Sequence, residues 1–162
     1  MSDLLTKIPL TYEPLRKNRW MLRFPADLGI QEWTLVEANR PRISQKEKPV
    51  EFLNTETYVV GRYNWEEVKV QLRDPIGPST SQAVMEWVRL TSESVTGRQG
   101  YAIGYKRDVE LEMLDPTGAV VQKWILKNCF ITSADFGTLS YTDDGLATVD
   151  IVLRPDYCIL AY

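Results

Sequence analysis

The acidic side chains of this sequence come closest to a catalytic arrangement. Three acidic pairs stand close together, namely Glu66 with Glu67, Glu110 with Glu112, and Asp143 with Asp144. A carboxylate pair that flanks one bond supports glycoside hydrolysis. Two carboxylates two positions apart share one face of a strand, which is commonplace where that face meets solvent. We therefore do not interpret these pairs as a catalytic site.

The other possible reactive groups lack their partners. Asp143-Asp144-Gly145 lacks the ligand ladder of a calcium loop, and it predicts a hairpin turn instead. Gly97, Gly100 and Gly104 do not stand in the strand–loop–helix context of a phosphate-binding loop. The sequence contains no histidine, which removes the commonest general base, the usual activator of a serine nucleophile and the commonest ligand of catalytic zinc. We expect no enzymatic activity, no cofactor and no metal site.

Composition points to one ordinary domain. The chain has 162 residues, a hydrophobic content of 44% and a net charge of −3, so a basic nucleic-acid footprint is absent. Cys129 and Cys158 lack the spacing of a redox motif, and we interpret them as structural thiols while leaving their oxidation open. No apolar run reaches the length of a membrane span, and residues 1–8 lack a signal-peptide core. These features favour synthesis and use in a cytoplasm.

Strand patterns dominate the first half of the chain. Residues 1–17 read as an extended arm with apolar side chains, and strands are expected over residues 18–24 and 31–38. Residues 42–63 hold two β-prone pieces around Asn54, which predicts a protruding hairpin or a long ordered loop. Residues 65–73 alternate most clearly, with Val68, Val70 and Leu72 on one face.

The second half contains one helix and a series of strands. Ser79 with Gln82 forms a capping-box pattern, and apolar residues then recur at helical spacing. Residues 98–108 are expected to be a flexible connector, followed by strands over 108–114, 119–126 and 128–133, with a turn at residues 115–118. Residues 139–142 should pair with residues 146–154 through Asp143-Asp144-Gly145. The fold class is mainly β, a barrel or sandwich of about eight strands with one helix.

The aromatic content suggests both a core and an interface. The five tryptophans, Trp20, Trp33, Trp65, Trp87 and Trp124, all fall in expected strands or in the helix, and most should be core. Aromatic side chains also anchor contacts between proteins, and exposed strand edges invite pairing with other chains. A closed ring of subunits would satisfy such edges.

Three stretches carry a resemblance to a known family. The first is residues 47–54 followed by Val59-Val60-Gly61 and Trp65, and the second is residues 67–72 followed by an Asp-Pro break and a helix with Glu86-Trp87. The third runs from residues 126–132 through 149–157. Over residues 18–157 the chain resembles the tail tube proteins of contractile-tailed bacteriophages, which are similar to the type VI secretion tube protein. The resemblance implies a tail-tube β-barrel domain (18–157), whereas the N-terminal arm (1–17) and the C-terminal tail (158–162) depart from the family pattern.

The resemblance implies a hexameric ring whose subunits pool their strands into one barrel around a channel. Rings would stack into a tube that conducts DNA without binding it specifically, inside a contractile sheath that drives the tube through the host envelope. Further partners would be a tape-measure protein, the baseplate and a tail terminator, and the location would be the virion tail after synthesis in the host bacterial cytoplasm. The protruding segment 44–63 would reach the adjacent ring. Its candidate contact residues are Val50, Phe52, Leu53, Tyr58, Val59 and Val60.

Polar strand faces are candidates for the channel wall, although the same residues could face solvent or the sheath. The candidates are Glu67, Lys69, Gln71, Glu110, Glu112, Thr148 and Asp150. Two related roles stay open, a tube-initiating ring at a baseplate and the tube of a secretion or injection system. A monomeric β-barrel binding module or carbohydrate-active domain is the alternative of another class, and it would need a concave pocket with convergent polar groups.

Overall fold

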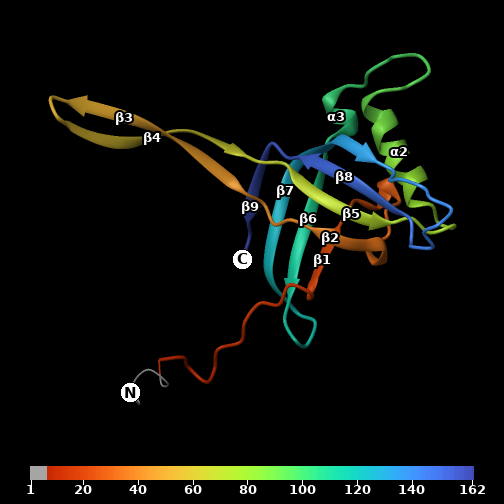
Figure 1. Ribbon diagram of the computed structural model, residues 1–162, viewed down its shortest axis with the longest axis horizontal. Coiled ribbons are helices and arrows are strands. Elements are labelled where there is room, and N and C mark those ends of the chain that lie inside the picture. The colour runs from red at the N-terminus through yellow and green to blue at the C-terminus, as the bar shows by residue number, and fades with distance from the viewer. Residues whose placement is uncertain (1–6) are drawn as a thin grey trace.

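Strands are the main regular structure of the protein, whose computed structural model describes residues 7–162 (Figure 1). The strands are β1 (Trp20–Arg23), β2 (Leu35–Ala38), β3 (Ile43–Phe52), β4 (Thr55–Trp65), β5 (Val68–Arg73), β6 (Arg107–Leu114), β7 (Val120–Asp135), β8 (Thr148–Arg154) and β9 (Tyr157–Leu160). The helices are η1 (Ala26–Leu28), η2 (Glu32–Thr34), α2 (Thr80–Thr91) and α3 (Ala102–Tyr105). Within residues 7–162, no helix is long and apolar enough to cross a membrane.

Seven strands form one antiparallel sheet that β7 divides into two halves. Half A contains β1, β6, the first part of β7, and β9, and half B contains β2, β5, β8 and the second part of β7. Among residues 7–162, β3 and β4 pair only with each other and form a separate two-stranded ribbon. The mainly β fold class expected from the sequence is therefore confirmed.

The two halves enclose one hydrophobic core. Alternation in β5 and β8 turns every second side chain inward, and the inward residues are fully or almost fully buried. They pack in one cluster with side chains of β1, β6 and α2, among them Leu22, Leu111 and Trp87. This arrangement is a β-sandwich.

Helix α2 covers one side of the sandwich. The Ser79 hydroxyl accepts a hydrogen bond from the Gln82 backbone N–H (3.3 Å), so the expected N-cap is present. Trp87 is completely buried, donates from Nε1 to the Tyr105 carbonyl (2.8 Å), and meets the Phe24 ring edge to face (6.2 Å). The helix is thereby fixed to β1 and α3 through one aromatic side chain.

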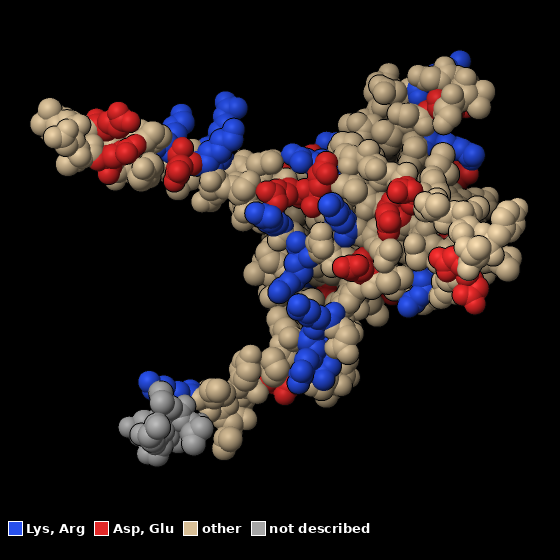
Figure 2. Space-filling model, viewed as in Figure 1, with Lys and Arg blue, Asp and Glu red and all other residues tan. Residues whose placement is uncertain are grey.

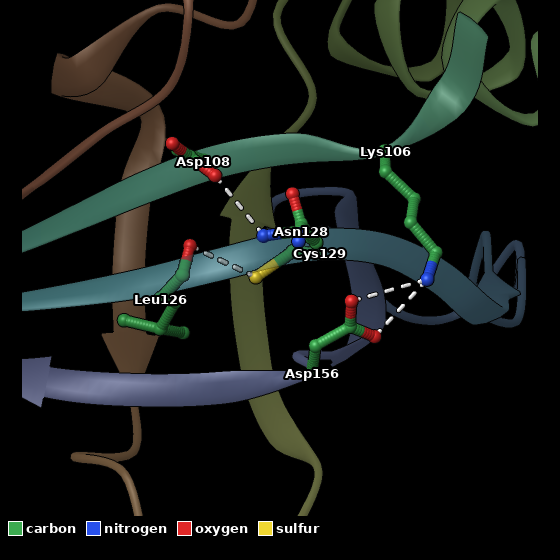
Figure 3. Close-up of polar contacts among 6 residues, drawn as sticks. All are labelled: Lys106, Asp108, Leu126, Asn128, Cys129 and Asp156. Atoms are coloured by element: carbon green, nitrogen blue, oxygen red, sulfur yellow. Dashed lines mark hydrogen bonds and ion pairs between the residues drawn. The ribbon is translucent and has the colours of Figure 1, made fainter. Parts of the chain in front are cut away.

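A bulge at Asn128 lets β7 pass from half A to half B. Asn128 has a positive φ of 55°, and its N–H donates to the Asp108 carboxylate (3.0 Å) (Figure 3). That hydrogen bond is the main cause that lowers the pKa of Asp108 below its usual value, and Lys127 (3.1 Å) lowers it further. Lys106 pairs with Asp156 (3.0 Å) beside the bulge. The bend is thus held by charged groups in β6, in β7 and in the segments that precede β6 and β9.

The two cysteines lie free and buried next to this bend. The Cys129 thiol is directed at the Leu126 carbonyl (3.5 Å), and Cys158 lies opposite Leu126 in β9. Burial raises the pKa of both thiols, that of Cys158 to about 11, and the neighbouring Cys158 adds to the rise at Cys129. Both thiols are therefore protonated at neutral pH.

Several sequence predictions are confirmed and several are wrong. The strand around Val68, the capped helix, the turn at residues 115–118 and the hairpin around Asn54 are present. Residues 31–38 are not one strand, because residues 32–34 form η2, and the connector 98–108 contains α3. Residues 139–142 form no strand, and residues 136–147 make an irregular loop.

The hairpin predicted at Asp143-Asp144-Gly145 is absent, and its absence has a physical reason. Gly145 N–H donates to the Asp143 carboxylate (2.9 Å), so the residues do turn locally. β8 nevertheless pairs with β5 and with the second part of β7, which gives it two partners and a buried face. Long-range pairing thus outweighs the local turn signal. Residues 157–160 form β9, which pairs with β7.

Candidate functional site

The β3–β4 hairpin is the most prominent feature of the surface, and it extends from one end of the molecule along its longest axis (Figure 1). Every residue of β3 is exposed. The apex is a two-residue turn in which Leu53 has a φ of 54° and the Thr55 hydroxyl donates to the Phe52 carbonyl (2.6 Å). A monomer therefore leaves an ordered, largely unpacked ribbon in solvent.

The register of the hairpin divides its side chains between two different faces. Directly paired residues share a face in an antiparallel ribbon. The first face carries Lys48, Val50, Phe52, Thr55, Thr57 and Val59, and the second carries Glu47, Pro49, Glu51, Glu56, Tyr58 and Val60. Carboxylates occur only on the second of these faces. The apex itself is free of charge (Figure 2).

The base of the hairpin is fixed to both halves of the sandwich. The Trp65 ring meets the Trp124 ring of β7 edge to face (6.4 Å). Arg154 of β8 donates to the Asn64 side chain (3.1 Å), and Arg42 pairs with Glu66 (3.1 Å). These contacts give the ribbon a defined direction.

The structure brings all candidate ring-to-ring residues onto this hairpin, and all of them are exposed. They are Val50, Phe52, Leu53, Tyr58, Val59 and Val60. The register separates them, since Val50, Phe52 and Val59 lie on the first face and Tyr58 and Val60 on the second. That they contact another ring stays a prediction.

The candidate channel residues fall into two separate groups. Lys69, Gln71, Thr148 and Asp150 lie on the outer face of half B, and Glu67 immediately precedes β5. Glu110 and Glu112 lie on β6 in half A instead.

The two carboxylates of β6 have local partners. Glu110 pairs with Lys123 (3.3 Å). Glu112 lies on the same face of β6 as Glu110, opposite to Leu111, but its side chain is buried there and pairs with Arg23 (3.3 Å) of β1. A buried carboxylate needs such a partner, because an uncompensated charge inside a protein is costly. In the single copy, the Glu112 carboxylate is therefore buried and paired with Arg23 rather than open to a channel.

The outer face of half B carries a row of polar side chains across all of its strands. Glu37 of β2 lies opposite Gln71 of β5, which lies opposite Asp150 of β8, and Asp150 lies opposite Asp135 of β7. Like charges placed directly opposite each other, such as Asp135 and Asp150, destabilise a sheet. Lys69, Arg73 and Arg154 supply cations on the same face. The face is polar and mixed in charge.

At each edge of half B, the last strand is paired on one side alone, as far as residues 7–162 show. One edge is β2, which pairs only with β5, and the other is residues 130–135 of β7, which pair only with β8. The four strands alternate in direction, so the two edges run antiparallel to one another. One copy could therefore continue the sheet of the next.

Sequence reasoning missed three parts of this surface. A groove of about 440 Å³ lies between residues 36–40, the arm at residues 15–17, and side chains of β1 and β6. Glu37 and Asp135 join the polar row only through pairings between distant strands. The loop 136–147 was read as half of a hairpin. No local sequence signal marks these contacts.

No family model matches the chain, and no curated protein matches it. Several solved structures are similar to the chain. A chain in the cryo-EM structure of the anti-feeding prophage cap, the tube terminating cap, shares 17% identity and a TM-score of 0.73 over 99% of this chain and 98% of that one. A chain of the sheath–tube complex of an extracellular contractile injection system (PVC) shares 15% identity and a TM-score of 0.68, over 99% and 96%.

A more distant similarity extends to Hcp1 from Flavobacterium johnsoniae. That chain shares 7% identity and a TM-score of 0.55, covering 88% of this chain and 94% of that one. At such identities the similarity establishes the fold. This protein therefore has the fold found in tube components of contractile injection systems.

Proposed function

We propose that this protein is a structural subunit of a hollow tube in a contractile injection system or phage tail. Six copies would form a ring, and rings would stack through the β3–β4 hairpin. The unpartnered, antiparallel edges of half B carry this proposal, because each copy offers the partner strand that its neighbour lacks. Half B would thereby contribute four strands to a continuous barrel.

The hairpin supports the stacking part of the proposal. Its apolar side chains are exposed in the monomer, including Phe52 at 73% and Leu53 at 89%. Apolar side chains gathered on an exposed, ordered ribbon mark an interaction site. A hairpin that leaves the sandwich along its longest axis can reach a copy in the next ring.

The outer face of half B would line the channel. Its carboxylates Glu37, Asp135 and Asp150 offset the cations there, so the wall would not gain affinity for nucleic acid through counterion release. Such a wall suits passage of DNA in a phage tail. It equally suits passage of a folded or unfolded protein cargo in an injection system.

Two related positions in the same machine are alternatives. Similarity to chains of the anti-feeding prophage cap and of the PVC sheath/tube terminator favours a tube-terminating ring as the second candidate. Similarity to a chain of the anti-feeding prophage baseplate, with a TM-score of 0.70, accords with a tube-initiating ring. In all three positions the partners would be further copies of this chain, a sheath and neighbouring rings. A tape-measure protein would lie inside a main tube.

Electron microscopy and native mass spectrometry of the purified protein test the proposal. A tube subunit gives rings and stacked tubes of uniform bore, and a terminator or initiator gives rings that do not stack into long tubes. A stable monomer at high concentration contradicts all three positions. Retention of DNA by assembled tubes would contradict the assignment of the half B face to the channel.

A further inference from the structure

The end of the molecule opposite the hairpin carries a second exposed apolar surface. It consists of the loop between β7 and β8 and the turn between β5 and α2, which a hydrogen bond from Asp74 N–H to the Ala147 carbonyl (3.1 Å) holds together. Its large apolar side chains are strongly exposed, and they are Ile76, Leu139, Tyr141 and Leu146. We call this surface the loop pole.

The loop pole has an ordered shape. Gly137 N–H donates to Asp135 (2.9 Å), and Gly145 N–H donates to Asp143 (2.9 Å). The loop curves around a shallow hollow of about 330 Å³, lined in part by Leu139, Tyr141 and Leu146. Irregular loops longer than about 12–15 residues are uncommon in compact domains, and residues 136–147 stand at the lower end of that range.

The hairpin and the loop pole lie at opposite ends of the same axis. In Figure 1 the hairpin points to the left, whereas the loop between β7 and β8 (blue) and the turn between β5 and α2 (yellow-green) lie on the right. When two different surfaces at opposite ends of one chain complement each other, copies associate head to tail, and the assembly stays open unless its rotation closes it into a ring. This is the geometry that an elongating stack needs.

The charges select one face of the hairpin for this contact. The loop pole carries the neighbouring carboxylates Asp143 and Asp144, so the second hairpin face, with Glu47, Glu51 and Glu56, would be repelled. The first face carries no carboxylate. It offers apolar side chains and the ammonium group of Lys48.

We propose that the loop pole of one copy receives the hairpin of a copy in the next ring. Val50, Phe52 and Val59 would pack against Leu139, Tyr141 and Leu146, and Lys48 would face Asp144. This inference rests on the proposed tube function and names the receiving surface of the stack.

Disulfide trapping tests the contact directly. In the variant Phe52→Cys with Leu139→Cys, each copy carries one thiol at each end, so oxidation of assembled protein should give a ladder of covalent oligomers on a denaturing gel. The native Cys129 and Cys158 are buried and will not contribute. The control combines Phe52→Cys with Val95→Cys. Val95 is as exposed as Leu139 but lies between α2 and α3. An equal ladder from the control, or none from the first variant, overturns the proposal.

A charge exchange supplies a second test that does not depend on oxidation. Lys48→Glu should raise the protein concentration needed for stacking about three- to tenfold, and Asp144→Lys should do the same, as expected for an exposed ion pair turned repulsive. The double variant should stack at nearly the wild-type concentration. Asp144 is chosen because Asp143 holds the loop through Gly145. Additive losses in the double variant contradict the contact.

The outcomes separate this inference from the proposed function. If the wild-type protein forms tubes but the variant Phe52→Cys with Leu139→Cys gives no ladder, the tube function stands and the receiving surface is refuted. Wild-type protein that forms neither rings nor tubes refutes both.

Discussion

Replacing Phe52 and Val59 together by Asp should abolish stacking and leave the subunit folded. Both residues lie on the first face of the hairpin, and neither belongs to the hydrophobic core. Complete burial of one such side chain stabilises an interface by about 1.5–3 kcal/mol. Phe52 is 73% exposed and Val59 is 51% exposed, so the surface still to be buried corresponds to about 2–4 kcal/mol together.

That free energy converts into a large shift in assembly. At about 1.4 kcal/mol per tenfold, losing it raises the critical concentration for stacking about 30- to 700-fold. The introduced carboxylates add a desolvation cost in the same direction. Sedimentation of tubes over a concentration series measures the shift, and circular dichroism checks that the fold is kept.

A matched variant controls for the effect of two new charges. Val95→Asp with Ile103→Asp changes two equally apolar residues that are 91% and 92% exposed but lie away from the hairpin. This control should stack at the wild-type concentration. Normal stacking of the hairpin variant, or an equal loss in the control, would refute the assignment of the hairpin to ring contacts.

Three further predictions concern the fold that positions these surfaces. Trp87→Ala should lower the free energy of unfolding by about 3–5 kcal/mol in chemical denaturation, since the ring is completely buried; a loss below about 1 kcal/mol would contradict its anchoring role. Cys129 and Cys158 should resist a thiol reagent at pH 8 until the protein unfolds. The free energy of unfolding should fall as the pH rises from about 9 towards 11, because the thiols lose their protons at a lower pH in the unfolded chain than in the folded protein. The pKa of Asp108 is lowered in the folded protein, so its carboxylate stabilises the fold above the usual aspartate pKa of 3.8, and this stabilisation is lost as the pH falls further. Asp108→Asn should therefore make the melting temperature fall less steeply at acid pH, and an unchanged profile would contradict this.

Local patterns in the sequence account for most of the elements that form the sandwich. Alternation predicts β5 with its buried face, and the Ser79 cap predicts the start of α2. Two β-prone pieces on both sides of Asn54 predict the protruding hairpin, which is present. Each of these features depends on neighbours within a few residues, so the sequence contains the needed information.

The parts that escaped prediction depend on contacts between distant segments. The buried Glu112 has its charge partner in Arg23, about ninety positions away. The polar row on half B needs the register of four strands, and no local spacing reveals that Glu37 and Asp135 belong to it. The bulge at Asn128, held by Asp108, moves half of β7 into another part of the sheet and leaves residues 130–135 as a free edge.

Cryo-electron microscopy of the purified protein at high concentration tests the central claim most directly. We expect ring-shaped particles in which β2 of one copy pairs with residues 130–135 of the next, around a bore lined by the outer face of half B. Dispersed single copies, or rings in which both of these strand edges stay unpaired, would contradict it.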